Sequence, residues 1–166
     1  GMAPETVARI LASQHTISPH RMALSTVNRE GTSFTLIDDS FNANPDSMKA
    51  GLNGLKAWNS NDGKEPFRVA LLGAMLELGA DETALHTSIG PYADELGIDA
   101  IIAVGSAQDQ HLDALAQALA DGARQSQSAS VDCVHDIDAA EQLVIDLARN
   151  HPDAVVLLKG SHASGL

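Results

Sequence analysis

Short apolar segments alternate with longer helical patterns through most of this chain, and that alternation constrains its fold more than any other feature. The apolar segments are residues 67–73, 100–105, 131–134 and 154–158. Helical patterns precede the last three of them, at residues 82–96, 109–121 and 138–150. Strands that are apolar on both faces and joined by helices are typical of a parallel sheet covered on both sides.

The N-terminal part adds a hairpin and one more helix. Residues 22–28 and 33–38 alternate or run apolar on either side of a turn, which predicts two antiparallel strands. Residues 45–58 carry apolar side chains at helical spacing. We therefore predict an α/β, Rossmann-like fold, with a mainly parallel sheet of about six strands, an antiparallel edge hairpin and helices on both faces.

Two helix starts are indicated by capping residues. Asn44 stands before Pro45, where an amide side chain can cap the first turn and proline is tolerated. Asp138 has Glu141 three residues later, as in a capping box. We expect one helix to begin at each of these places.

Charge and composition exclude several classes of partner. The formal net charge of −12 repels phosphate backbones and anionic lipid, so we expect no nucleic acid and no membrane surface as partner. No segment approaches the ~18 apolar residues of a membrane span, and residues 1–19 lack the apolar core of a secretory signal. We expect a cytoplasmic protein without membrane insertion, in which the single cysteine, Cys133, packs as a small hydrophobic residue.

Both ends of the chain suggest a piece of a longer protein. Residues 6–11 have the pattern of the last turns of a helix, and the polar residues 13–19 end in proline and predict a linker. Gly1 before Met2 is typical of a remnant left by tag removal. The chain stops at Leu166, before a helix that follows the last strand could be complete.

Polar or glycine-containing loops follow the apolar strands, and a ligand would bind there. In open α/β sheets, ligands bind beyond the carboxyl ends of the strands. The loops are residues 38–45, 73–79, 105–108 and 159–162. We expect them to converge on one site at one edge of the sheet.

Two of these loops carry charged groups. Asp38 and Asp39 can bind ribose hydroxyls, a metal ion or a helix N-terminus; the alternative is that one caps the next turn while the other is solvated. Lys159 and Ser161, at an expected helix start, can hold a carboxylate or a phosphate; the alternative is a solvated lysine and a capping serine.

Several common nucleotide and metal motifs are missing. The chain contains no Gly-x-x-x-x-Gly-Lys-Ser/Thr sequence to hold a triphosphate and no Gly-x-Gly-x-x-Gly sequence after a strand to hold a dinucleotide. The seven histidines show no metal-ligand spacing, so we expect no metal site. His86 lies in a predicted helix and could point toward residues 73–79, although packing in the core is the simpler expectation.

Three loop sequences, in this order, resemble the signatures of the Mur ligase family. Residues 38–48, DDSFNANPDSM, resemble the motif that opens the C-terminal domain of these enzymes. Residues 73–79, GAMLELG, followed by His86, resemble the second signature, and residues 158–161, LKGS, resemble the third. The likeness covers residues 21–166 and is greatest to the type that adds D-alanyl-D-alanine to UDP-N-acetylmuramoyl-tripeptide.

The resemblance implies a place in peptidoglycan synthesis. Mur ligases have a UDP-sugar domain, a P-loop ATPase domain and a Rossmann-like domain that brings in the amine and closes over the nucleotide. ATP phosphorylates the peptide carboxylate, and the amine attacks the acyl phosphate to give an amide. Residues 21–166 resemble the third domain, with residues 1–20 as the tail of the ATPase domain and a hinge. ATP and Mg²⁺ would be held mainly by the absent central domain, so the chain alone would contain no catalytic residue and would be inactive.

The resemblance also implies roles for individual residues. Arg21 resembles the arginine that reaches the ATP phosphates on closure, Asp39 resembles the aspartate that contacts the ribose, and Asn42 lines the same loop. These three are the predicted nucleotide-binding residues. The predicted substrate-binding residues, for the incoming D-alanyl-D-alanine, are Asn44, Ser106, Lys159, Ser161 and His162.

Three positions depart from the usual pattern of this family. Phe41 stands where tyrosine is usual, Ala74 where an acid is frequent, and His162 where arginine is frequent. Neutral histidine lacks the donor fork of a guanidinium, so Lys159 is the expected anchor of the donor carboxylate.

Two other classes of protein stay open. The C-terminal domain of another Mur-type ligase or of folylpolyglutamate synthase would share the fold, although the Asn-Ala-Asn-Pro loop and the Glu77 loop argue against it. A receiver-like signalling domain also places an acid pair at one strand end and a lysine at another. Gly73 and Ala74, however, occupy the place where a receiver needs its phosphoacceptor aspartate.

Overall fold

A six-stranded sheet forms the centre of the computed structural model, which describes residues 20–164 and 166. The strand order is β1-β2-β6-β3-β4-β5; β1 and β2 are antiparallel and the other neighbours are parallel. The strands are β1 (Ala23–Arg29), β2 (Thr32–Asp39), β3 (Arg68–Leu72), β4 (Ala100–Val104), β5 (Ser130–Val134) and β6 (Val155–Lys159). The predicted helix end at residues 6–11 and the predicted linker at residues 13–19 lie outside the described residues.

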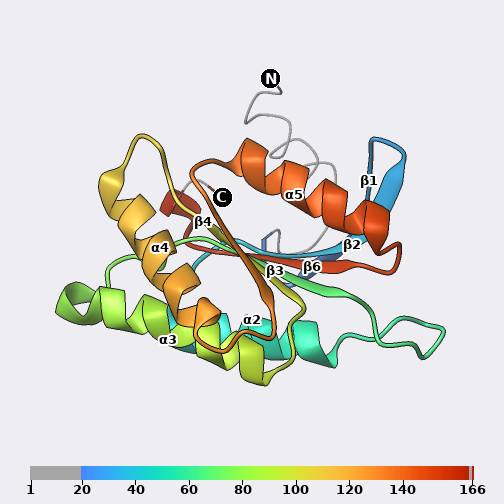
Figure 1. The fold of residues 1–166 in the computed structure, drawn as a ribbon, viewed down its shortest axis with the longest axis horizontal. Helices are drawn as coiled ribbons and strands as arrows, with labels where there is room; N and C mark the ends of the chain where they lie inside the picture. The colour runs from blue at the N-terminus through green and yellow to red at the C-terminus, as the bar shows by residue number, and fades with distance from the viewer. Residues whose placement is uncertain (1–19, 165) are drawn as a thin grey trace.

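Helices cover both faces of this sheet. They are α2 (Pro45–Ala57), α3 (Glu82–Glu95), α4 (Gln110–Arg124) and α5 (Ile137–Asn150), with the short 3₁₀ turns η1 (Gly79–Asp81) and η2 (His162–Ser164). Helix α5 lies over one face, and α2 and α3 lie over the other, where α4 also packs (Figure 1). The predicted fold class is confirmed. Among the described residues, no helix has both the length and the apolar composition needed to cross a membrane.

Alternating side chains of the central strands enter two separate cores. In β3, Val69 and Leu71 pack with α5, whereas Ala70 and Leu72 pack with α2, α3 and α4. A strand with helices on both sides buries side chains on both of its faces, which explains the nearly continuous apolar segments of the sequence. The prediction that β5 is equally apolar is wrong, because it is an edge strand whose Asp132 is exposed.

The helix starts agree with the sequence in one of the two predicted cases. Asn44 caps α2: its side-chain oxygen accepts from the Ser47 amide at 2.8 Å, and the Ser47 hydroxyl accepts from the Asn44 amide. The start predicted at Asp138 is wrong, because Asp136 caps α5 by accepting from the Ala139 amide at 2.8 Å. Asp138 lies inside the first turn, where its negative charge interacts favourably with the positive end of the helix dipole.

Helices α3 and α4 approach each other closely through small residues. Pro91 lies inside α3 and has no N–H, so the Thr87 carbonyl loses its usual intrahelical donor. The backbone of α4 packs against that carbonyl at Gly122, where an added Cβ would overlap the Thr87 oxygen. Both helices contribute buried residues to the core on this face of the sheet, so the contact between them closes that core to solvent.

We expect Gly122→Ala to lower the free energy of unfolding by about 2 kcal/mol, since backbone on both helices must move to admit a methyl group. Urea denaturation measures the change. Gly54→Ala in α2 is the matched control: its added Cβ meets only the flexible end of Met22, so the change should be neutral or stabilising by up to ~1 kcal/mol. Equal effects of the two substitutions would contradict the close approach of α3 and α4.

Candidate functional site

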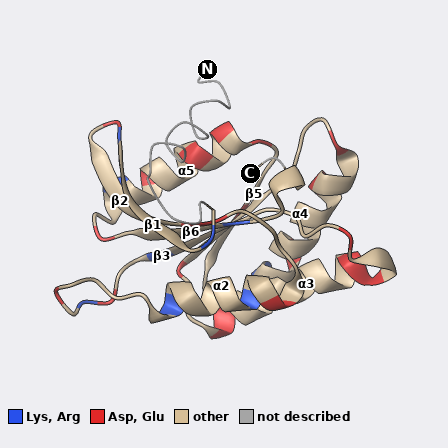
Figure 2. Ribbon diagram, turned by 180° about the vertical axis from the view of Figure 1, so that it is seen from behind, with Lys and Arg blue, Asp and Glu red and all other residues tan. Residues whose placement is uncertain are grey.

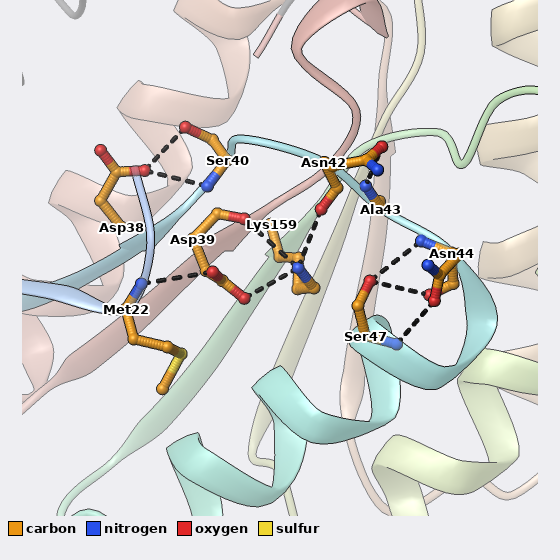
Figure 3. Close-up of polar contacts among 9 residues, drawn as sticks. All are labelled: Met22, Asp38, Asp39, Ser40, Asn42, Ala43, Asn44, Ser47 and Lys159. Carbon is orange, nitrogen blue, oxygen red and sulfur yellow. Dashed lines mark hydrogen bonds and ion pairs between the residues drawn. The ribbon is translucent and has the colours of Figure 1, made fainter. Parts of the chain in front are cut away.

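An ion pair between two adjacent strand ends is the centre of the candidate site. Strands β2 and β6 are parallel neighbours, and their register pairs Asp39 with Lys159. The Lys159 ammonium lies 2.8 Å from the Asp39 carboxylate, and the lysine side chain is only 2% exposed (Figure 3). The pair therefore joins residues that are 120 positions apart in the sequence.

The Lys159 ammonium also holds the loop that follows β2. It donates to the main-chain oxygen of Asn42 at 3.0 Å and lies 3.4 Å from the main-chain oxygen of Asp39. Its three N–H groups thus face three oxygens of the protein. The stem passes Gly51 of α2 so closely that an added Cβ there would lie 2.7 Å from the lysine Cδ.

The position of Lys159 differs from the one that its sequence indicates. The sequence predicts a loop at a helix start, with a solvated lysine as the alternative. Lys159 is instead the last residue of β6 and is buried, and the next helical turn begins only at His162. The expected loop location and the solvated alternative are therefore wrong, because the strand extends one residue beyond its apolar segment, into a space that Asp39 makes favourable for a cation. Binding of a carboxylate by Lys159 stays a prediction.

The neighbouring acid, Asp38, is held differently. It is 4% exposed, and one of its oxygens accepts from the Ser40 amide at 3.1 Å and from the Ser40 hydroxyl at 2.7 Å. The other oxygen lies 2.8 Å from Nδ1 of His20. Asp38 therefore caps the turn, as one alternative expected, but Asp39 is paired with Lys159 and is not the solvated partner.

A pocket of about 360 Å³ opens over this ion pair. It is lined by Arg21, Met22, Asp39, Phe41, Asn42, Asn44, Ser47, Ala50, Gly51 and Lys159. Arg21 is exposed at its rim, with the guanidinium carbon 4.4 Å from the centroid of the Phe41 ring. Phenylalanine therefore keeps a stacking surface at the position where the Mur ligase pattern has tyrosine.

Five of the eight predicted site residues meet at this pocket. They are Arg21, Asp39, Asn42, Asn44 and Lys159. Ser106, Ser161 and His162 do not line it: Ser106 follows β4, which β3 separates from β6, and the other two follow β6 toward η2. The expectation that all the loops converge on one site is met at this pocket only by the loop after β2 and by Lys159 at the end of β6. The loop after β3 instead bonds to the loop after β6, where the Ser161 amide donates to the Ala74 carbonyl oxygen at 3.0 Å.

The two asparagines of the pocket also support local structure. Asn42 accepts from the Ala43 amide at 2.8 Å through its side-chain oxygen. The side-chain oxygen of Asn44 is used in the α2 cap. Their side-chain N–H₂ groups could donate hydrogen bonds to a ligand.

His86 fixes the loop after β3. It is completely buried; its Nε2 accepts from the Met75 amide at 2.9 Å, and its Nδ1 lies 2.7 Å from the Glu82 carbonyl oxygen. This pattern requires a neutral ring with the proton on Nδ1. Burial lowers the pKa of His86, although the nearby Glu82 opposes that shift.

No motif in the sequence marks His20 as a site residue. Nothing around this residue indicates a role, because its partner Asp38 lies 18 positions away. For Cys133, burial raises the pKa of the thiol, and the side chain packs against the core as expected. Within residues 20–164 and 166, no three His, Cys, Asp or Glu side chains form a group that could hold a metal ion.

The fold and the pocket define an open α/β domain whose site lies beyond the ends of adjacent parallel strands. A family model described as "Mur ligase, glutamate ligase domain" matches residues 20–162. The chain therefore belongs to the Mur ligase family, through this domain. That membership excludes the receiver-like interpretation.

Several curated relatives match along the whole chain. A UDP-N-acetylmuramoyl-tripeptide–D-alanyl-D-alanine ligase of Mycobacterium tuberculosis is 37% identical over 172 residues, which is 100% of this chain and 33% of that protein. The ligase of the same name from Mycobacterium leprae is 36% identical over 175 residues, 100% of this chain and 32% of that protein. The chain thus spans about a third of the length of these relatives.

Solved structures show the same fold. A structure of MurF from Acinetobacter baumannii has a TM-score of 0.65 and 26% identity, covering 99% of this chain and 31% of that one. MurF ligase from Thermotoga maritima, solved in complex with ADP, has a TM-score of 0.56 and 21% identity, covering 96% of this chain and 33% of that one. The second likeness concerns the fold alone.

We expect Lys159→Met to lower the free energy of unfolding by about 3 kcal/mol, because it leaves the largely buried Asp39 carboxylate without its partner. Adding Asp39→Asn should restore part of this loss, since the unpaired charge is then removed. Lys56→Met is the control: its ion pair with Glu65 is long and exposed, so the change should stay under ~0.5 kcal/mol. Similar losses for the two lysines, measured by urea unfolding, would refute the structural role of the buried pair.

His86 should make stability fall as the pH drops below its ordinary pKa of 6.5. The folded protein holds this ring neutral, so below that pH the unfolded chain binds a proton that the folded chain does not. Above pH 6.5 both states are neutral and the contribution is constant. His86→Gln keeps an acceptor for the Met75 amide but cannot titrate. Urea unfolding at several pH values should show a steeper acid decline for the parent chain than for this variant; parallel curves would contradict the prediction.

Proposed function

We propose that this chain is the C-terminal domain of an ATP-dependent ligase that adds D-alanyl-D-alanine to UDP-N-acetylmuramoyl-tripeptide in peptidoglycan synthesis. The observation that carries the proposal is the match, over 100% of the chain, to relatives with that activity in their names. In this assignment residues 21–166 form the domain that binds the amine donor and closes over the nucleotide. Residues 1–20 are the tail of the central domain and the hinge, and the enzyme acts in the cytoplasm.

The pocket over Asp39 and Lys159 is the proposed contact with ATP. An anion can bind this chain only where a local cation overcomes a net charge of −12, and acidic residues lie on helices over both faces of the sheet (Figure 2). Arg21 suits that role because it is exposed and, among the described residues, makes no ion pair. We assign it to the phosphates, and Asp39 and Asn42 to the ribose side of the nucleotide.

Lys159 supports this site by shaping it. Its ammonium already contacts three oxygens of the protein, so it fixes Asp39 and the Asn42 backbone in place. Direct binding of the dipeptide carboxylate by Lys159, Asn44, Ser106, Ser161 or His162 remains a prediction. For Lys159 the buried contacts favour a positioning role over direct contact.

The proposed chemistry divides between this chain and the rest of the ligase. Phosphoryl transfer depends on positioning and on charge stabilisation around the phosphates. Since the sequence has no P-loop, phosphate activation and Mg²⁺ binding fall to the central domain, which also faces the UDP-sugar substrate. The residues of this chain bring a cation and the amine donor to the acyl phosphate on closure, and the chain alone should release no phosphate from ATP.

In the full-length ligase, Arg21→Ala should lower kcat/KM for ATP about 30- to 1000-fold, the effect of losing a charge-assisted contact made in the transition state. Steady-state phosphate release measures it, with the melting temperature as a folding check. Arg124→Ala removes another exposed cation, from the end of α4, and should leave kcat/KM within about twofold of the parent enzyme. If the two variants behave alike, Arg21 does not contact the nucleotide.

A further inference from the structure

The segment His20–Met22, which leads into β1 beside the carboxyl end of β2, has an unusual backbone. His20 has a φ of 63° and Met22 a φ of 47°, both in the left-handed region that residues other than glycine seldom adopt. Two such residues on either side of one exposed residue, Arg21, cost conformational free energy. They persist only where surrounding contacts hold them.

The two consecutive acids at the end of β2 supply those contacts. Asp39 accepts from the Met22 amide at 3.2 Å, on one side of Arg21 (Figure 3). Asp38 lies 2.8 Å from Nδ1 of His20, on the other side. The Phe41 amide also donates to the His20 carbonyl oxygen at 3.1 Å. The segment is therefore bound at both ends to the last residues of β2 and the turn that follows them.

The carboxylate of Asp38 is itself fixed by hydrogen bonds. It is buried, and the Ser40 amide and hydroxyl both donate to the oxygen that does not face His20. The Ser40 hydroxyl also lies 3.3 Å from His20 Nδ1. Since a carboxylate only accepts, Nδ1 of His20 must carry the proton of the bond to Asp38. These contacts leave Arg21 over the Phe41 ring at the rim of the pocket.

We propose that His20 and Asp38 are positioning residues that hold Arg21 in place for the nucleotide. This inference rests on the proposed function, in which Arg21 contacts the ATP phosphates. An arginine on a loose segment loses conformational entropy when it binds a phosphate, and that loss weakens the interaction. The bond between His20 and Asp38 orders the segment beforehand, so less entropy is lost in the bound state.

Variants at His20 and Arg21 of the full-length ligase test the proposal by their kcat/KM for ATP. His20→Gly keeps the left-handed backbone accessible but removes the bond to Asp38, and it should lower kcat/KM about tenfold. His20→Asn can still donate to Asp38 and tolerates a positive φ, so it should stay within about threefold of the parent enzyme. The double variant His20→Gly with Arg21→Ala should equal Arg21→Ala alone within about twofold, because His20 acts through Arg21. Asp38→Asn would also disturb the bonds to Ser40, so it does not isolate the effect on His20. The His20 side chain is about a third exposed, so the substitutions at His20 are the better test.

The outcomes separate the two proposals. If Arg21→Ala lowers kcat/KM but His20→Gly does not, the positioning role is wrong and the nucleotide contact stands. If the losses from His20→Gly and Arg21→Ala multiply in the double variant, His20 acts by another route and the inference is overturned. If Arg21→Ala has no effect, the proposed nucleotide contact fails, and the positioning role fails with it. Melting temperatures within a few degrees of the parent enzyme exclude misfolding as the cause of any loss.

Discussion

The buried ion pair of Lys159 and Asp39 is the interaction on which the candidate site depends. A lysine that is only 2% exposed needs an anionic partner, because the loss of its hydration is otherwise uncompensated. The partner is available because the last strand of the chain inserts between β2 and β3. The same ammonium binds the Asn42 carbonyl, so the charge that stabilises the strand ends also sets the shape of the loop around the pocket.

The adjacent acids Asp38 and Asp39 bind different partners because they are neighbours on a strand. Successive side chains of a strand point to opposite faces of the sheet. Leu36, two residues before Asp38, packs on the α5 side, whereas Ile37, two residues before Asp39, packs on the side of α2. Asp39 therefore reaches Lys159 beside α2, and Asp38 reaches His20. A pair of identical residues can in this way fix both a strand end and the chain segment that carries Arg21.

The two cations of the pocket differ in exposure, and this difference supports separate roles for them in the proposed function. Lys159 is enclosed and its donors face protein oxygens, whereas Arg21 is exposed and rests on an aromatic ring. The chain spans about a third of the length of its relatives, and in the proposed function its pocket faces the other domains of the ligase. An exposed guanidinium on a segment fixed by Asp38 and Asp39 is well suited to act across such a boundary, because guanidinium binds phosphate in a defined geometry.

The sequence by itself determined the type of nearly every described element, because buried strands and amphipathic helices have different apolar periods. The cap at Asn44 and the family signatures could also be recognised locally. Strand order could not, since β6 pairs with β2 and β3 across long stretches of chain. Only the tertiary structure decided that Lys159 is buried against Asp39, that His20 binds Asp38, and that Ser106 lies apart from the pocket. The first and the last depend on which strands are neighbours, which is determined by the packing of helices on both faces of the sheet and not by any residue's immediate neighbours in the sequence. The second depends on the left-handed backbone at His20 and Met22, which no residue type there requires.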